Sequence, residues 1–174
     1  MHWEVIVESP EKFEAIRNEA SRIEESTRIS GKSHFEASRL WDISNLVMGG
    51  TATICAVLAA NLTRSFPSIA TSLTVSTAIL TGLMTFMRVG DRAATHKKSG
   101  DQLHGLMYEV GFFIRVTLVG ASDLAITEKQ LKGFSDRLIS LNRVSPSPPR
   151  WAYELAKKGI AAGETDFSVD QTRD

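Results

Sequence analysis

Cysteine is almost absent from the 174-residue chain, since Cys55 is its only copy. A single cysteine excludes an intrachain disulfide and every metal site built from paired cysteines. Net charge is absent as well, because Lys and Arg total 20 and Asp and Glu also total 20. This balance gives no basis for direct binding of nucleic acid or of another polyanion.

Charge is also missing from two long runs in the middle of the chain. Residues 43–63 and 65–87 contain no Asp, Glu, Lys or Arg, and only Arg64 separates them. A helix needs about 20 mostly apolar residues to cross the hydrocarbon core of a bilayer. The two runs therefore predict a transmembrane hairpin. The alternative is a soluble bundle with two buried core helices, but surface-packed soluble helices usually keep a charged side.

The motifs of common enzyme chemistry are missing too. The sequence contains no nucleophile elbow, phosphate-binding loop, dinucleotide fingerprint or cluster of metal-ligating residues. We therefore expect no enzymatic activity, no catalytic residue, no bound metal and no cofactor. The first residues lack the apolar core of a signal peptide, so we expect the first uncharged run to act as the targeting signal.

The charged parts of the chain show helical periodicity. Ser9-Pro10 is typical of a helix start, and apolar or small residues recur from there at spacings of three and four. This first stripe comprises Phe13, Ile16, Ala20, Ile23, Thr27, Ser30, His34, Ala37 and Trp41. A second stripe comprises His96, Gly100, Leu103, Met107, Val110 and Ile114. Beyond a break at residues 120–123, Thr127 and Gln130 have the spacing of a capping box.

These patterns predict an all-α membrane protein, a two-transmembrane helical hairpin with long helices that extend into the cytoplasm. The expected segments are an N-terminal cytoplasmic helix (1–42), a first transmembrane helix (43–63), an external turn (64–68), a second transmembrane helix (69–87), cytoplasmic helices (88–144), and a Pro-rich linker, short helix and tail (145–174). Basic residues gather before the first run and after the second, whereas the turn holds only Arg64. The positive-inside rule then places both termini in the cytoplasm.

The second uncharged run carries an unusual number of hydroxyl groups. Four threonines and a terminal arginine fall on one narrow helical face: Thr74, Thr77, Thr81, Thr85 and Arg88. The first run offers a face of small residues, namely Gly49, Ala52, Ala56 and Ala60. Such faces predict close packing of membrane helices. The functional alternative, which the pattern leaves open, is the wall of a pore in an oligomer.

Polar residues of the cytoplasmic helices form two further candidate sites. His34 and His96 lie on the inner stripes of helices that we expect to be neighbours, and Glu109 follows as a salt-bridge or capping residue. Pairing of the histidines across the interface is the structural interpretation, and a proton- or ligand-sensing switch is the functional one. A basic cluster directly follows the second run: Arg88, Arg92, Lys97 and Lys98. Topology alone explains it, and binding of a signal is the alternative.

Two stretches of the sequence carry a resemblance to a known family. They are "SHFEASRLW" (33–41) and "FMRVGDRAATHKKSGDQLHGLMYEV" (86–110). Together with the hairpin and the helical remainder, they resemble the SMODS- and SLOG-associating two-transmembrane effector (SLATT) domains. The resemblance covers residues 15–141. The family often has a tyrosine seven residues after the histidine, whereas this chain has Leu103 at that position.

The resemblance implies a membrane effector of a bacterial anti-phage system. Such an effector would oligomerise to form a pore or disrupt the inner membrane, which arrests or kills the infected cell. It would be activated by a nucleotide signal or by an adjacent sensor or polymerase protein. His34 and His96 would belong to its cytoplasmic stalk and the two spans to its pore. The alternative function is a non-conducting membrane scaffold that docks a soluble partner through its cytoplasmic helices.

Overall fold

A computed structural model describes residues 10–165 as an all-helical chain, and no strand occurs in that range. The main helices are α1 (Pro10–Leu62), α2 (Pro67–Met87), α3 (Val89–Phe112), α4 (Leu124–Val144) and α5 (Arg150–Ala161). A π-helical segment, η1 (Phe113–Thr117), and a 3-10 turn, η2 (Leu118–Gly120), connect α3 to α4. The expected lead-in at 1–9 and the end of the tail, 166–174, lie outside the described residues.

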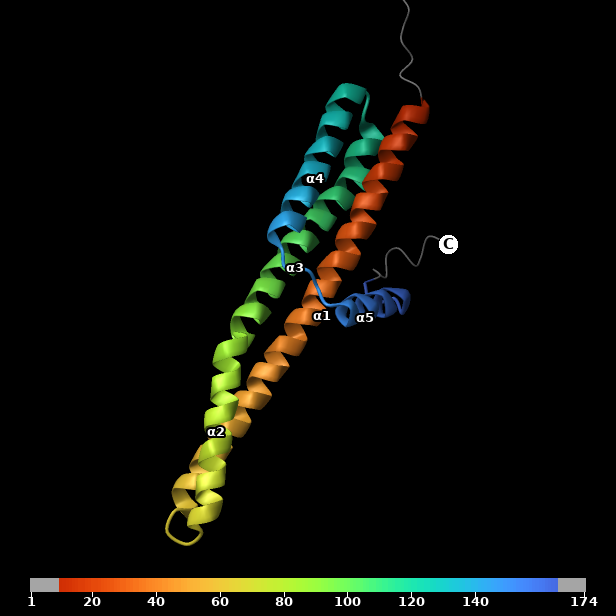
Figure 1. Cartoon of the computed structure of the whole chain (residues 1–174). Coiled ribbons are helices and arrows are strands. Elements are labelled where there is room, and N and C mark those ends of the chain that lie inside the picture. Colours follow the sequence, from red (N-terminus) through yellow and green to blue (C-terminus); the bar gives the residue numbers. More distant parts are fainter. Residues whose placement is uncertain (1–9, 166–174) are drawn as a thin grey trace, which may run out of the picture.

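Helix α1 is a single uninterrupted helix of 53 residues, which at 1.5 Å per residue is about 80 Å long. The expected boundary between residues 42 and 43 is therefore no break in the backbone. Helices α2 and α3 return antiparallel to α1, α4 folds back along α3 and α1, and α5 lies across α1 (Figure 1). We call residues 43–87 the apolar hairpin, and residues 10–42 with 88–144 the stalk.

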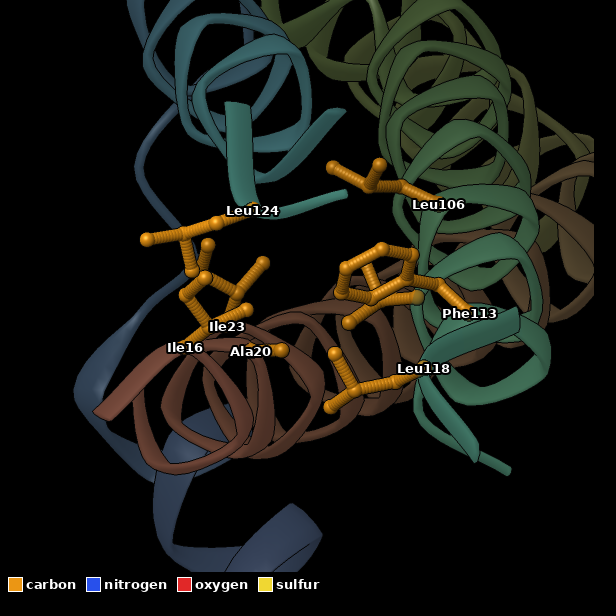
Figure 2. Close-up of a cluster of buried hydrophobic side chains, with 8 residues drawn as sticks. Ile16, Ala20, Ile23, Leu106, Phe113, Leu118 and Leu124 are labelled. Carbon is orange, nitrogen blue, oxygen red and sulfur yellow. The ribbon is translucent and has the colours of Figure 1, made fainter. Parts of the chain in front are cut away.

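The stalk encloses the main hydrophobic core at its end away from the hairpin. Its members come from α1, α3, η1, η2 and α4 (Figure 2), and they are Ile16, Ala20, Ile23, Leu106, Val110, Phe113, Leu118 and Leu124. The stripe predicted for residues 96–114 is buried at every position except Ile114, which is half-buried. The apolar periodicity of the sequence thus identified the face of α3 that packs on α1.

Two glycines allow α1 and α3 to approach closely in the middle of the stalk. A Cβ at Gly31 would lie 3.5 Å from the Cβ of Leu103, and a Cβ at Gly100 would lie 2.9 Å from Cε1 of Phe35. The predicted stripe placed Ser30 at this level, but Gly31 is the buried residue and Ser30 is half-buried. Of the two glycines, only Gly100 is too close to its neighbour for a side chain, because a Cβ at Gly31 would make ordinary van der Waals contacts.

Two local features differ from the predictions. Helix α4 begins at Leu124, and its cap is Asp123, whose Oδ1 accepts a hydrogen bond from the backbone N–H of Ile126. The predicted capping box at Thr127 is therefore wrong, since Thr127 already lies inside the helix. The second uncharged run also does not continue straight into α3, because Arg88 has a left-handed backbone (φ 50°, ψ 47°) that ends α2 and starts α3.

The apolar hairpin contrasts with the stalk in its exposure. In α1 and in the α2–α3 segment, the stretches apolar and long enough to cross a membrane are only 11% and 6% buried within the chain. A core helix of a soluble protein is covered by its own chain, so these helices need a different cover. The fold therefore contains two long apolar helices that could span a membrane, joined by the turn at residues 63–66.

Candidate functional site

His34 and His96 meet where α1 packs on α3, in the part of the stalk next to the apolar hairpin. Their Nδ1 atoms lie 2.9 Å apart, and only 3% and 6% of the two residues is exposed. One Nδ1 donates and the other accepts, so the two neutral rings must be opposite tautomers. Below the pair, Ser38 Oγ donates a hydrogen bond to the carbonyl oxygen of Ala93, 3.0 Å away. The polar groups thus bridge the two helices at two successive turns.

The surroundings hold both histidines in their neutral form. Burial and, second, repulsion from a protonated His96 lower the pKa of His34 from 6.5 to about 4. Burial and, second, the charge of Arg92 lower the pKa of His96. After one proton is added, the charged imidazolium can still donate its Nδ1–H to the neutral ring. After a second proton is added, both Nδ1 atoms carry a hydrogen, so two donors face each other and the hydrogen bond is lost. The pair can therefore join α1 and α3 only while at least one ring is neutral.

The four exposed residues of the predicted basic cluster have different neighbours. Arg88 forms an exposed ion pair with Asp91, at 2.7 Å, and the guanidinium of Arg92 lies 5.2 Å from the ring centroid of Trp41. Lys97 and Lys98 are exposed on α3. The two arginines therefore lie at the junction of stalk and hairpin, where each already has a protein neighbour, and the two lysines remain on the outside.

Glu109 forms an ion pair with Arg137 of α4, and both side chains are about half exposed. This is the salt-bridge role that the sequence left open beside a capping role. The partner could not be identified from spacing, because α4 folds back only after the irregular segment at residues 113–123. The ion pair fixes α4 against α3 beside the stalk core.

The threonine face of α2 divides between two environments. Thr77 lies half-buried in the seam with α1, and its hydroxyl is within hydrogen-bond distance of the carbonyl oxygens of Leu73 and Ala52. Thr74, Thr81 and Thr85 are exposed. The hydroxyls of Thr74 and Thr85 donate to carbonyl oxygens one turn earlier in their own helix, so neither requires water as an acceptor.

The small residues of α1 divide in the same way. Ala52 is buried in the seam, Gly49 is half-buried beside Met84, and Ala56 and Ala60 are exposed. The seam itself follows Met48, Ala52, Cys55 and Ala59 on α1, and Ala70, Leu73, Thr77, Leu80 and Met84 on α2. The two successive spacings of four from Ala52 to Ala60 advance around the helix by about 40° each, so the predicted face leaves the seam after Ala52.

One group of exposed small residues from each helix lies on the same side of the hairpin. In each helix these residues lie about a quarter turn from the seam, in the direction of increasing residue number. Because the two helices run antiparallel, this rotation carries both sets of residues to the same side of the hairpin. This small-residue side comprises Thr53, Ala56 and Ala60 of α1 with Thr74, Ala78, Thr81 and Thr85 of α2. The opposite, branched side carries the exposed residues Val47, Ile54, Leu58, Ile79 and Leu83, with Thr51, Ser72 and Ser76 between them.

Sequence reasoning missed a groove at the far end of the stalk, between α3, η1 and α4. Its volume is about 830 Å³, and its apolar lining includes Tyr108, Phe112, Val116 and Phe134. Phe112 is 61% exposed whereas the adjacent Phe113 is 2% exposed. The signal in the sequence is helical spacing: Phe113 follows the buried Leu106 by seven residues and enters the core, whereas Phe112 falls on the outer face of α3.

Within residues 10–165, no three side chains of His, Cys, Asp or Glu come together as a metal site. Comparisons of the chain with protein families, with characterised proteins and with solved structures find no match.

Proposed function

We propose that the chain is a two-span protein of the bacterial inner membrane, with both termini in the cytoplasm, whose copies assemble to permeabilise that membrane. The observation that carries the proposal is the asymmetry of the apolar hairpin. One side presents small and hydroxyl-bearing residues, and the other carries most of the exposed branched apolar side chains, interspersed with Thr51, Ser72 and Ser76. Lipid tails cover branched side chains well, whereas small residues let a second helix pack closely.

The orientation is supported by charge at the two ends of the hairpin. Arg39, Arg88 and Arg92 surround its base, and Arg64 alone lies at its tip. Basic residues concentrate on the cytoplasmic side of membrane proteins. Trp41 lies at the same base, half-buried, as is common for aromatic rings at a membrane interface. The stalk then extends into the cytoplasm.

Permeabilisation requires several copies, because two helices cannot enclose a channel. In an assembly, Thr74, Thr81 and Thr85 would pack against a neighbouring hairpin at rest and face water when the hairpins separate. Thr77 would take no part unless α1 and α2 also separate, since it lies in their seam. The role in anti-phage defence, with activation by a nucleotide signal or an adjacent protein, is the part that depends on the resemblance to SLATT domains.

The test compares substitutions on the two sides of the hairpin. Expression in bacteria challenged with phage should depolarise the inner membrane, as followed with a potential-sensitive dye. Thr81→Leu with Thr85→Leu should abolish depolarisation, because larger side chains separate the packed helices. Ile79→Leu with Leu83→Ile, on the branched side, conserves volume and should change nothing. Full depolarisation by the leucine variant, with membrane insertion intact, would exclude the small-residue side as the assembly surface.

A second pair of substitutions separates packing from water contact. Thr81→Val with Thr85→Val keeps the side-chain shape and removes only the hydroxyls. A wetted pore wall predicts reduced ion flux with unchanged oligomers, whereas a packing surface predicts unchanged flux.

The groove at Phe112 favours a second candidate, a non-conducting scaffold that docks a soluble protein. Exposed apolar grooves of this size often mark interaction sites. If the chain reconstituted in liposomes releases no dye at any density, and Phe112→Ser abolishes its cellular effect, the scaffold becomes the better description.

A further inference from the structure

Lys32 of α1 is a largely buried cation whose anion comes from the far end of the described chain. Only 16% of its side chain is exposed, and its Nζ lies 2.5 Å from Oε2 of Glu164. The Glu164 side chain is 58% exposed. A buried ammonium group needs a counter-charge, but this carboxylate is held only from one side and remains accessible to solvent.

The backbone after α5 is built to place that carboxylate. The N–H of Glu164 donates to the carbonyl oxygen of Gly159, and the N–H of Gly163 donates to that of Ile160. These two bonds and the φ of 79° at Gly163 form a Schellman cap. A Cβ at Gly159 would overlap both the Glu164 carboxylate and Cε of Lys32. A side chain at position 159 would therefore require the ends of Glu164 and Lys32 to shift from this arrangement.

Helix α5 is thereby fastened across the outside of α1. Its small residues Ala152, Ala156 and Gly159 are buried, and its linker reaches the junction of stalk and hairpin, where Pro146 and Pro149 lie with Trp41 and His96 around one cavity. Residues 145–164 form a strap that crosses α1 from the His96 side to the Lys32 side (Figure 1). The ion pair of Lys32 and Glu164 closes its end.

The strap ends in a cavity of about 330 Å³ that suits a small organic anion. Its walls include Arg28, Lys32, Phe35, His104 and Glu164, and its size lies at the lower end of ligand sites in proteins. The ring of His104 makes edge contacts with Phe35, at 5.9 Å between centroids, and with Tyr108, at 4.7 Å. These rings provide one aromatic wall beside the two cations.

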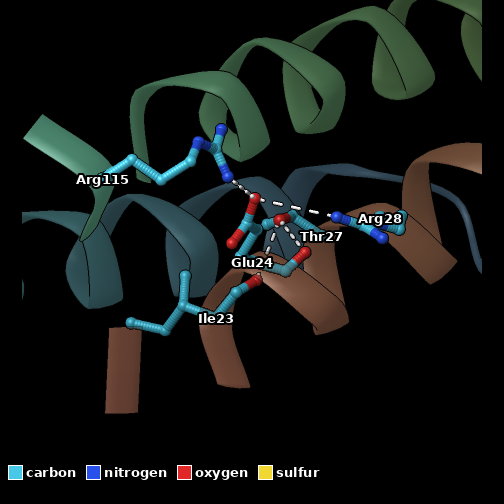
Figure 3. A network of polar contacts seen from close by, with 5 residues as sticks. All are labelled: Ile23, Glu24, Thr27, Arg28 and Arg115. Atoms are coloured by element: carbon cyan, nitrogen blue, oxygen red, sulfur yellow. Dashed lines mark hydrogen bonds and ion pairs between the residues drawn. The ribbon is translucent and has the colours of Figure 1, made fainter. Parts of the chain in front are cut away.

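The charges of the cavity leave room for an external anion. Arg28 is 3.7 Å from Glu24, but Glu24 also binds Arg115 at 3.1 Å, so one carboxylate serves two guanidinium groups (Figure 3). Glu36 is the other carboxylate on the wall besides Glu164. If Glu164 leaves, Glu36 is the remaining carboxylate on the wall and Arg28 still shares Glu24 with Arg115, so the two cations of the cavity are incompletely neutralised.

We propose that this cavity is a binding site for a small anion with an aromatic ring, and that Glu164 is its tethered competitor. The ligand's phosphate or carboxylate replaces the Glu164 carboxylate on Lys32 and Arg28, and its ring lies against Phe35 and His104. Binding then unfastens α5 from α1. The proposal does not depend on membrane permeabilisation, so its failure and that of the proposed function are distinguishable.

The test uses 4-fluorophenyl phosphate as the probe, followed by fluorine NMR with the full chain in detergent micelles. The wild type should bind it weakly, and Glu164→Gln should bind about fivefold more tightly, the upper end for an ion pair that reaches solvent on one side. Lys32→Gln should abolish binding. Glu154→Gln, on an exposed face of α5 near Arg150, is the matched control and should bind as the wild type does. Inorganic phosphate should compete poorly, because it lacks the ring.

Hydrogen exchange of α5 supplies a second measurement that needs no substitution. The probe should accelerate exchange of the amides of residues 152–161 in the wild type, and Gly159→Ala should accelerate it without ligand, because the added methyl group displaces Glu164. Equal affinity in the wild type and Glu164→Gln, retained binding in Lys32→Gln, or unchanged α5 exchange at saturating probe would each overturn the proposal.

Discussion

The Nδ1 atoms of His34 and His96 lie 2.9 Å apart between α1 and α3, and both residues are almost fully buried. The interface they share is the extensive contact of α1 with α3, which also holds Gly31 and Gly100 in close approach. Any change in the histidine pair therefore acts on the helices that continue into the apolar hairpin.

The first prediction concerns pH. Both histidines have a pKa below 6.5 in the folded chain, with that of His34 at about 4. The unfolded chain takes up protons at these histidines as pH falls through 6.5, whereas in the folded chain His96 does so at a lower pH and His34 only near pH 4. The contribution of the neutral histidines to the free energy of unfolding is therefore fully present above pH 6.5 and is lost as the pH falls from 6.5 to 4. For His34 alone the loss is about 3 kcal/mol.

Thermal unfolding of the detergent-solubilised chain from pH 7.5 to 4 measures this loss. The variant His34→Gln with His96→Gln cannot be protonated at these positions and should lose less stability over the same range. His104→Gln, at an exposed histidine of the same helix, should keep the wild-type dependence. Parallel curves for the wild type and the double variant would contradict the assignment.

The second prediction concerns the two glycines of α3 that differ in their surroundings. A Cβ at Gly100 would lie 2.9 Å from the Phe35 ring, whereas a Cβ at Gly105 would meet nothing within 4 Å. Gly100→Ala should lower stability because the ring must move. Gly105→Ala should raise it by up to about 1 kcal/mol, since alanine is the better helix former. Chemical denaturation of both variants measures whether each substitution raises or lowers the free energy of unfolding. A higher stability of Gly100→Ala would show that the Phe35 ring moves aside without an energetic penalty.

The sequence predicted those elements whose signal is local and periodic. The two uncharged runs, the inner stripe from His96 to Val110 and the linker before α5 all appear in the fold. It also placed His34 and His96 on facing stripes, although it could not give their contact distance. The pattern of threonines on α2 was visible too, but which of them enters the seam depends on the crossing of α1 and α2, and no local pattern encodes that crossing.

Contacts between distant segments could not be predicted. Glu164 reaches Lys32 only because of the left-handed Gly163 and the path of the strap, and Glu24 meets Arg115 across 91 positions of the chain. Of the irregular segment at residues 113–123, only a break at 120–123 was expected. The burial of Phe113 needs no irregularity, because it lies three residues after Val110 and seven after Leu106 on the inner face of α3, whereas Phe112 lies on the outer face.

The third prediction uses this pair of neighbours. Phe113 is 2% exposed and contacts the ring of Phe134 at 5.4 Å between centroids. Phe113→Ala should cost about 3–5 kcal/mol of stability through lost burial and the cavity left behind. Phe112→Ala should cost less than about 1 kcal/mol, because its ring is 61% exposed. Thermal unfolding of both variants in detergent compares them, and similar losses would show that the register of η1 is different.

The fourth prediction concerns the joint between hairpin and stalk. Arg88 is the only non-glycine residue with a left-handed φ among residues 10–165, and this conformation costs an L-residue about 1–2 kcal/mol. Arg88→Gly should leave stability unchanged or raise it by about 1 kcal/mol, since the ion pair that it removes, with Asp91, is exposed and contributes little. Arg88→Val should lower it, because a branched Cβ resists the left-handed region.

Lys97→Gly is the matched control for this joint. Lys97 is exposed in the regular part of α3, so glycine there should cost about 1 kcal/mol. The two glycine substitutions thus have opposite expected signs in the same unfolding assay. If Arg88→Gly costs as much as Lys97→Gly, then α2 continues into α3 as one regular helix, and motion of the stalk would be transmitted to the hairpin rigidly rather than through a bend at Arg88.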